Sequence, residues 1–240
     1  SWLERRDLPP GSVAIGSKWG YTYTAEWRVD AEQHEVKELS AATLRRQLAE
    51  TRALLGAELD LYQIHSATIE SGVLDDAAVM DALAELRREG VAIGLTATGP
   101  GQAATIARAI ELGAFDAVQA TWNLLERSAG PALAAAHAAG MGVIVKEALA
   151  NGRLTARGDV PGLVRAAARR RVAPDALALA FVMAEPWADV VLSGAADAAT
   201  LASNLSATAV TVDADLRAEL ASLVRDPDTY WAERAALPWN

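Results

Sequence analysis

The sequence predicts an α/β protein built on parallel strands. Short apolar runs alternate with stretches of helical spacing, and the predicted strands cover residues 13–18, 59–66, 91–96, 115–120, 142–147 and 189–193. A helix-bearing interval separates each strand from the next, as in parallel strands joined by crossover helices. The runs are apolar without strict alternation, so both faces of the strands are expected to be buried.

Polar residues at the ends of these runs favour a closed barrel over an open sheet. They are Lys18, His65, Thr96, Gln119, Lys146 with Glu147, and Ser193. Polar groups from successive strands converge on one mouth only if the sheet closes. No Gly-x-Gly-x-x-Gly follows a strand, so the usual dinucleotide fingerprint of the open sheet is missing.

Spacing and capping residues place the helices between the strands. They are predicted over residues 41–55 after the cap Ser40, and over 76–89, 102–112, 131–140, 197–205 and 213–224, with a longer helical stretch around Pro174. Residues 2–6 resemble the end of a helix, so we expect the chain to start in the middle of a unit. Residues 19–27 are predicted to form an aromatic loop, and 230–240 an aromatic tail.

Composition excludes several classes of protein. At 240 residues and 52% hydrophobic, the chain can form one large core. Its net charge of −9 argues against binding to nucleic acid or to an anionic membrane surface. It has no cysteine, and its three histidines are too far apart in sequence to suggest a local metal motif. No run approaches the length of a membrane span and no signal peptide is evident, so a cytoplasmic protein is expected.

His65 is the first candidate for chemistry. It ends the buried run 59–66, and histidine is the side chain that titrates near neutral pH and serves most often as an acid or base. Strand ends carry the chemistry of barrel enzymes. A hydrogen-bonded core histidine is the competing interpretation.

Six segments in order resemble the aldo-keto reductases over almost the whole chain. They are residues 17–20 (Ser-Lys-Trp-Gly), 60–65 (Asp-Leu-Tyr-Gln-Ile-His), 92–95 (Ala-Ile-Gly-Leu), 118–125 (Val-Gln-Ala-Thr-Trp-Asn-Leu-Leu), 142–145 (Gly-Val-Ile-Val) with Leu149, Ala150, Gly152 and Leu154, and 193–195 (Ser-Gly-Ala) with Asn204. The resemblance implies a (β/α)8 barrel that reduces carbonyls with a nicotinamide cofactor, NADPH or NADH. It implies that residues 1–240 form one barrel domain lacking its N-terminal βα units, with about six of the eight units present.

The same resemblance implies roles for particular residues. Lys18 and His65 would be two members of a catalytic group of four, whose aspartate and proton-donating tyrosine would lie in a missing N-terminal segment. Tyr21 or Tyr23 as a replacement donor is disfavoured, because nothing in the sequence fixes its distance to a substrate. The expected cofactor-binding residues are Thr96, Gln119, Lys146, Glu147, Leu149, Asn151, Ser193, Gly194, Ala195, Thr200 and Asn204. Trp19, Tyr21 and Trp27 are predicted to line the substrate pocket.

Three departures from the family pattern concern the cofactor. Thr96-Ala97 stands where a Ser-Asn pair usually holds the nicotinamide amide, so one contact is lost. Lys146-Glu147-Ala148 stands where an aromatic residue and Ser-Pro are usual; the two charged residues could simply pair with each other. The segment 194–200 has no basic residue to bind a 2′-phosphate, and Asp197 carries a negative charge, which would repel the phosphate. Weak discrimination between NADPH and NADH is therefore expected.

Two other functions compete with carbonyl reduction. A cofactor-binding sensor or interaction protein would have the same barrel and little turnover. A Schiff-base lyase would use Lys146 as its amine nucleophile, but it would leave Lys18, His65 and Gln119 unexplained. No metal is expected, and the partner is a small-molecule carbonyl substrate. The sequence indicates neither the substrate nor the oligomeric state.

Overall fold

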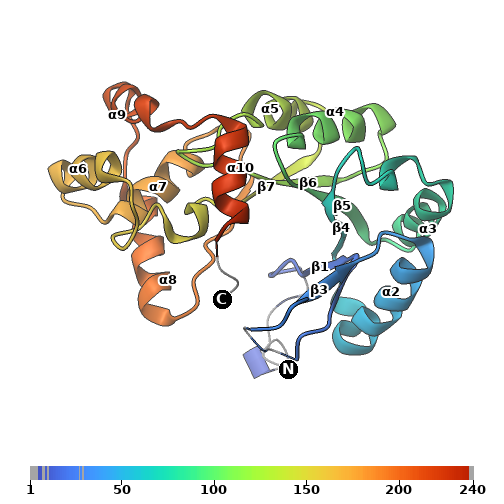
Figure 1. Ribbon diagram of the computed structural model, residues 1–240. Coiled ribbons are helices and arrows are strands. Elements are labelled where there is room, and N and C mark those ends of the chain that lie inside the picture. Colours follow the sequence, from blue (N-terminus) through green and yellow to red (C-terminus); the bar gives the residue numbers. More distant parts are fainter. Residues whose placement is uncertain (1–4, 7–8, 10, 27, 29, 238–240) are drawn as a thin grey trace. The chain divides into compact units, whose positions relative to one another are not determined.

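The computed structural model describes residues 5–6, 9, 11–26, 28 and 30–237, and divides the chain into two compact units, Ser1–Thr96 and Ala97–Asn240 (Figure 1). Both units are built from β-strands with helices between them, which confirms the predicted α/β class. In this described part of the chain, no helix combines the length and the apolar character needed to cross a bilayer.

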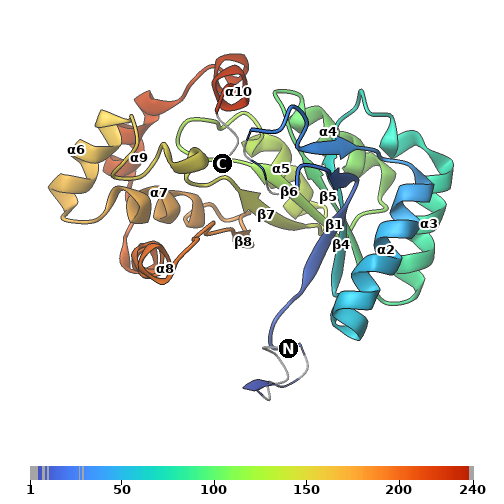
Figure 2. The ribbon, with the colours of Figure 1, turned by 60° about the horizontal axis from the view of Figure 1, so that its bottom comes forward.

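Unit 1 contains the strand order β1-β4-β5, with β1 and β4 parallel. Its elements are β1 (Gly16–Trp19), β2 (Tyr21–Tyr23), β3 (Glu35–Lys37), α2 (Ala41–Leu55), β4 (Leu61–Ala67), α3 (Ala77–Arg88) and β5 (Ala92–Ala97), whose last residue is the first of unit 2. Helices α2 and α3 pack side by side, and α2 also contacts β1 (Figures 1 and 2).

Side chains set the boundaries of these elements. Ser40 caps α2 by accepting a hydrogen bond from the Thr43 N–H, as predicted, and Asp76 caps α3 in the same way. β1 begins a few residues later than expected, at Gly16. There Asp60 joins the two strands, because its carboxylate accepts the Ile15 N–H (2.7 Å) and its own N–H donates to the Ile15 carbonyl (2.9 Å).

The predicted aromatic loop after β1 contains a hairpin. β2 pairs antiparallel with β3, with Tyr21 opposite Lys37 and Tyr23 opposite Glu35. Gly20 permits the turn into β2, because its φ of +115° suits glycine and a Cβ at this position would collide with the Leu39 side chain. The hairpin places Tyr21 directly after the strand that carries Lys18.

Unit 2 contains the parallel order β6-β7-β8. Its elements are α4 (Gln102–Leu112), β6 (Ala117–Thr121), α5 (Gly130–Ala138), β7 (Gly142–Lys146), α6 (Pro161–Arg170), α7 (Pro174–Met183), β8 (Val190–Val191), α8 (Ala198–Leu205), α9 (Ala214–Leu220) and α10 (Pro227–Ala235). α4 packs against α5, while α7 contacts both α6 and α8, and α6 contacts α9 (Figure 2).

The core of unit 2 follows the apolar runs of the sequence. β6 is buried along its whole length and α7 along most of it, since α7 presents apolar residues on every side. Asp189 repeats the role of Asp60: its carboxylate accepts the Val143 N–H (2.7 Å) and fixes the start of β8 beside β7. Asp197 and Asp213 cap α8 and α9. The expected aromatic tail instead contains α10, capped by Asp226.

Candidate active site

Lys18 and His65 lie on the same face of two neighbouring parallel strands in unit 1. In the β1–β4 register Lys18 is level with Gln63, and His65 follows Gln63 by two residues. Side chains of a strand alternate between faces, so Lys18, Gln63 and His65 share one face. Trp19 pairs with Ile64 on the opposite face, where both are almost completely buried. The alternation thus separates a polar face from the core.

The β2–β3 hairpin brings an aromatic ring onto His65. The ring centroids of Tyr21 and His65 lie 4.6 Å apart with an interplanar angle of 61°, a geometry that aromatic rings favour. The Gln47 side chain, from α2, fixes the backbone at this point. Its Oε1 accepts the Gly20 N–H (2.7 Å) and its Nε2 donates to the Tyr21 carbonyl (2.8 Å). Tyr21 is therefore held in place on both sides of the turn.

The residue after His65 has an unusual backbone conformation. Ser66 has a φ of +58°, which costs a residue other than glycine about 1–3 kcal/mol. Two side chains form hydrogen bonds with the backbone of Ser66. Thr96 Oγ1 accepts the Ser66 N–H (2.6 Å), and Lys37 Nζ donates to the Ser66 carbonyl (2.6 Å). The direction in which the chain leaves His65 is thus fixed by β3 and β5.

Two lysines lie at this end of unit 1. Loss of hydration lowers the pKa of both Lys18 and Lys37, although both residues remain exposed. Lys37 Nζ lies 5.9 Å from the Tyr21 ring centroid, within the range of a cation–π contact. Burial raises the pKa of the nearby Glu35, with an opposing effect from His34. An ammonium that has lost part of its hydration interacts more strongly with negative charge on a neighbouring atom.

The three predicted pocket aromatics have different positions. Tyr21 is half-buried against His65. Trp19 is 1% exposed and has the position of a core residue on the face opposite Lys18. Trp27 lies outside the described residues. Contact with a substrate stays a prediction for all three.

The predicted cofactor residues of β6 and β7 lie in unit 2. Gln119 is buried on β6 and pairs with Ile144, while Thr121 pairs with Lys146 at the end of β7. Leu149 is half-buried, and Asn151 is exposed in the following turn with a φ of +54°. Gln119 and Lys146 therefore occur at different levels of the two paired strands.

Glu147 is held by the C-terminal helix of unit 2. Arg234 of α10 donates to its carboxylate from Nε (3.1 Å to both oxygens) and from Nη2 (2.6 Å), while Lys146 Nζ is 3.8 Å away. Burial acts to raise the pKa of Glu147, but the Arg234 hydrogen bonds and the charges of Lys146 and Arg234 bring it below its ordinary value. The possible pairing of Lys146 with Glu147 is therefore secondary to the Glu147–Arg234 ion pair.

A buried polar network extends from this ion pair. Asn123 donates through Nδ2 to the Glu147 carbonyl (2.9 Å) and to the Tyr230 hydroxyl (3.0 Å). Burial, the largest influence, raises the pKa of Tyr230 to about 12. Arg153 bonds Glu233 (2.7 Å), which gives α10 a further attachment. The end of β7 and α10 thus form one connected structure.

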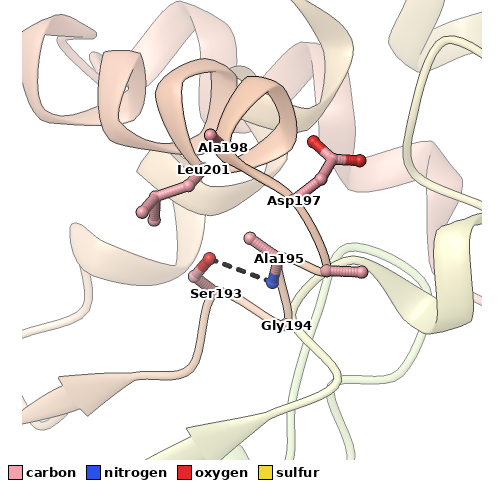
Figure 3. A pocket seen from close by; sticks show the side chains of 7 residues that line it. Ser193, Gly194, Ala195, Asp197, Ala198 and Leu201 are labelled. Carbon is pink, nitrogen blue, oxygen red and sulfur yellow. Dashed lines mark hydrogen bonds between the residues drawn. The ribbon is translucent and has the colours of Figure 1, made fainter. Parts of the chain in front are cut away.

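Three of the predicted residues around β8, Ser193, Gly194 and Ala195, line an open pocket of about 520 Å³ in unit 2. Ser193, Gly194 and Ala195 form one side, and the start of α8 forms the other (Figure 3). Ser193 Oγ accepts the Ala195 N–H (3.3 Å) and a hydrogen bond from Asn204 Nδ2 (3.0 Å). Asn204 is 5% exposed, and among the described residues its Oδ1 has no hydrogen-bond partner.

The charged residue that lines this pocket is the acidic Asp197, as the sequence predicted. Asp197 accepts the Thr200 N–H (2.7 Å), which occupies one amide of the first turn of α8. This hydrogen bond lowers the pKa of Asp197, with a smaller contribution from the charge of Arg157. Among the described residues, none that lines this pocket is basic. The charge of Arg157 acts on Asp197.

The structure thus brings the predicted residues together in two groups. Lys18, His65, Tyr21 and Thr96 gather at one end of unit 1, and Ser193, Gly194, Ala195, Thr200 and Asn204 gather around β8 in unit 2. Sequence reasoning missed Lys37 and Gln47, whose positions depend on the hairpin. It also missed Arg234 and Tyr230, although Asp226-Pro227 is a recognisable helix start that could have revealed α10.

Comparisons with known proteins identify the family and the fold. The model of the aldo/keto reductase family matches residues 1–225. Among solved structures, the holo form of aldo-keto reductase AKR11C1 from Bacillus halodurans has a TM-score of 0.71 at 20% identity, covering 93% of this chain and 76% of that chain. Its apo form has a TM-score of 0.64 at 22% identity, covering 78% and 69%.

A protein from Pseudomonas aeruginosa assigned to the aldo-keto reductases gives a TM-score of 0.62 at 24% identity, covering 83% of this chain and 69% of its own. At these identities the likeness shows the fold, and it confirms the predicted barrel class. No curated protein sequence matches the chain.

Proposed function

Since the chain belongs to the aldo/keto reductase family, whose members typically use nicotinamide cofactors, we propose that it reduces an aldehyde or ketone to an alcohol with NADPH or NADH. The observation that carries this proposal is the shared face of Lys18 and His65 at the ends of β1 and β4. Both residues stand near the ends of apolar runs in the sequence, and their strands are direct neighbours.

The chemistry explains why a carbonyl would bind beside these groups. Reduction of a carbonyl builds negative charge on its oxygen, so hydrogen-bond donors and cations at that oxygen lower the barrier. His65 can donate an imidazole N–H to the oxygen and orient it. Lys18 supplies a partly dehydrated ammonium on the same face, which stabilises the developing charge or the anionic form of an acid next to it.

The residues of unit 2 fit a dinucleotide cofactor. Asn204 donates through Nδ2 to the Ser193 carbonyl and to Ser193 Oγ (3.0 Å each), which holds in place a segment that lines the pocket. The amides at the start of α8 suit a phosphate oxygen, as helix N-termini do. When bound, the nicotinamide supplies the hydride. Ser193, Gly194 and Asn204 would bind and orient its nucleotide portion, and Gln119 the nicotinamide amide.

The family resemblance adds two groups to the proposed catalytic set, an aspartate and a proton-donating tyrosine N-terminal to Lys18. That part of the proposal stays a prediction. Lys146 as a Schiff-base nucleophile is less well supported, because that chemistry leaves Lys18, His65 and Gln119 without a role.

The test is turnover of a panel of aldehydes and ketones, followed by the absorbance of the reduced nicotinamide. We expect His65→Gln to lower kcat/KM by about 10²–10⁴-fold while the dissociation constant of the cofactor changes less than about threefold. His137→Gln is the matched control, because His137 lies on α5 in unit 2 and bonds Asp189. A folded His65→Gln protein with wild-type turnover would contradict the proposal. Cofactor binding without turnover of any carbonyl would favour the sensor.

A further inference from the structure

The β2–β3 hairpin meets the candidate catalytic histidine at two points. Tyr21, at the start of β2, packs on the His65 ring, and Lys37, at the end of β3, bonds the carbonyl of Ser66. Tyr21 and Lys37 are themselves directly opposite each other in the hairpin register. One small element thus holds both the imidazole and the backbone beside it.

We infer that this hairpin positions His65, with Lys37 and Tyr21 as positioning residues for the proposed reduction. The inference concerning catalysis rests on that proposed function. The geometric part concerns only unit 1 and stands without a cofactor.

The backbone conformation of Ser66 explains why His65 needs these positioning contacts. Its φ of +58° lies in the left-handed region, which residues with a Cβ rarely adopt. Without the Lys37 and Thr96 hydrogen bonds, Ser66 would relax towards the extended conformation of the strand, and the peptide that follows His65 would rotate with it. Lys37 contributes the stronger bond of the two, because an ammonium donor forms a charge-assisted hydrogen bond.

The hairpin is rigid enough to fulfil this role. Gln47 bonds the backbone of both Gly20 and Tyr21, and the Glu38 N–H bonds the Gly20 carbonyl (2.8 Å). These bonds tie the first and last residues of the hairpin to each other and to α2. The backbone of Tyr21 therefore cannot move away from His65 without breaking hydrogen bonds to an adjacent helix.

The catalytic consequence follows from the dependence of rate on geometry. Displacement of a catalytic group by about 1 Å can lower a rate roughly 100-fold. His65 must place an N–H on the carbonyl oxygen, so rotation of its ring acts on the chemical step. Cofactor binding, assigned above to unit 2, should be unaffected. A hairpin that merely covers the barrel would instead alter stability, with no specific effect on the histidine.

The first arm of the test is NMR of the histidine side chains in the full chain without cofactor. The protein has three histidines, so His65 is assigned by the signal lost in His65→Gln. We expect Tyr21→Leu and Lys37→Met each to shift the His65 ring signals, Tyr21→Phe to retain the ring contact, and Lys37→Arg to restore most of the wild-type position. Val36→Ala is the matched control, because Val36 neighbours Lys37 on β3 and its side chain points to the other face.

The second arm is steady-state kinetics with a carbonyl substrate. We expect Lys37→Met to lower kcat by about 10- to 100-fold with KM and cofactor affinity nearly unchanged, and Lys37→Arg to recover most of the loss. Unchanged His65 signals in Lys37→Met and Tyr21→Leu would overturn the inference, as would a Lys37→Met loss that Val36→Ala reproduces. If no carbonyl is turned over, the proposed function fails, and the NMR arm alone decides the positioning role.

Discussion

The Glu147–Arg234 ion pair gives the sharpest test of how unit 2 is held together. The proposed change is Arg234→Met, which keeps an apolar side chain and removes the guanidinium together with its contact to the Trp231 ring (5.6 Å to the centroid). Removing one partner of a fully buried pair costs about 3–5 kcal/mol, whereas exposed pairs contribute about 0.2–1 kcal/mol. Glu147 is 14% exposed and Arg234 is 35% exposed, and Lys146 remains as a partial partner. We therefore expect a loss of about 2 kcal/mol.

The loss should depend on pH in a defined direction. The pKa of Glu147 in the folded protein lies below its ordinary value. Its contribution to stability is therefore fully present above the unfolded-state pKa, about 4.3, and is lost as the pH falls through the folded-state pKa. The free-energy difference between wild type and Arg234→Met should be constant between about pH 6 and 8 and should shrink below about pH 4.

The measurement is urea unfolding followed by tryptophan fluorescence and circular dichroism, with the thermal midpoint as a second readout. A loss of about 2 kcal/mol corresponds to about 4–8 °C in a domain of this size. Glu111→Gln is the control, since Glu111 is 67% exposed in its pair with Arg108, and it should change stability by less than about 0.5 kcal/mol. An Arg234→Met effect no larger than that of Glu111→Gln, or one that persists unchanged to pH 3, would refute the reasoning.

Three further predictions concern the turn, the cofactor and Lys146. Gly20→Ala should destabilise unit 1 by about 1–3 kcal/mol. The loss should exceed that of Gly90→Ala, because both glycines have a positive φ but only a Cβ at residue 20 would collide with Leu39. Equal losses of stability in urea unfolding would disprove the collision. Fluorescence titration at fixed ionic strength should show less than about a hundredfold preference for NADPH over NADH, and a larger one would indicate that a basic residue such as Arg157 reaches the 2′-phosphate. Borohydride treatment with a small aldehyde should leave no adduct on Lys146, and an adduct located there by mass spectrometry would support the lyase.

The parallel strands could be predicted because the signals that define them are local. An apolar run with a polar last residue identifies a strand and its functional end, which placed Lys18 and His65 among the polar strand ends, and the family resemblance then gave these two a catalytic role. Helix caps are equally local, so Ser40, Asp197 and Asp213 could be assigned from the residues that follow them. Strand starts were less accurate, because they depend on carboxylates such as Asp60 that bond a neighbouring strand.

The elements that hold the candidate site could not be predicted in the same way. β2 and β3 are three residues each, and neither shows a pattern until the other is placed beside it. Tyr21 therefore looked unconstrained in the sequence, whereas Gln47 and the hairpin fix it against His65. Glu147 presented the same difficulty, because its partner Arg234 is 87 residues away.

Two of the candidate strand ends share one physical arrangement. Their reactive or charged side chains, His65 and Glu147, follow from a single residue at the end of a parallel strand. The orientation of each comes from an element outside those strands: the β2–β3 hairpin for His65, through Tyr21 and Lys37, and α10 for Glu147, through Arg234. A substitution of Lys37 or of a residue in α10 can therefore change activity without altering any residue proposed to touch a substrate. Because the hairpin contacts the histidine directly, its variants should affect kcat, whereas variants of α10 act on the end of β7 and should first affect the stability of unit 2.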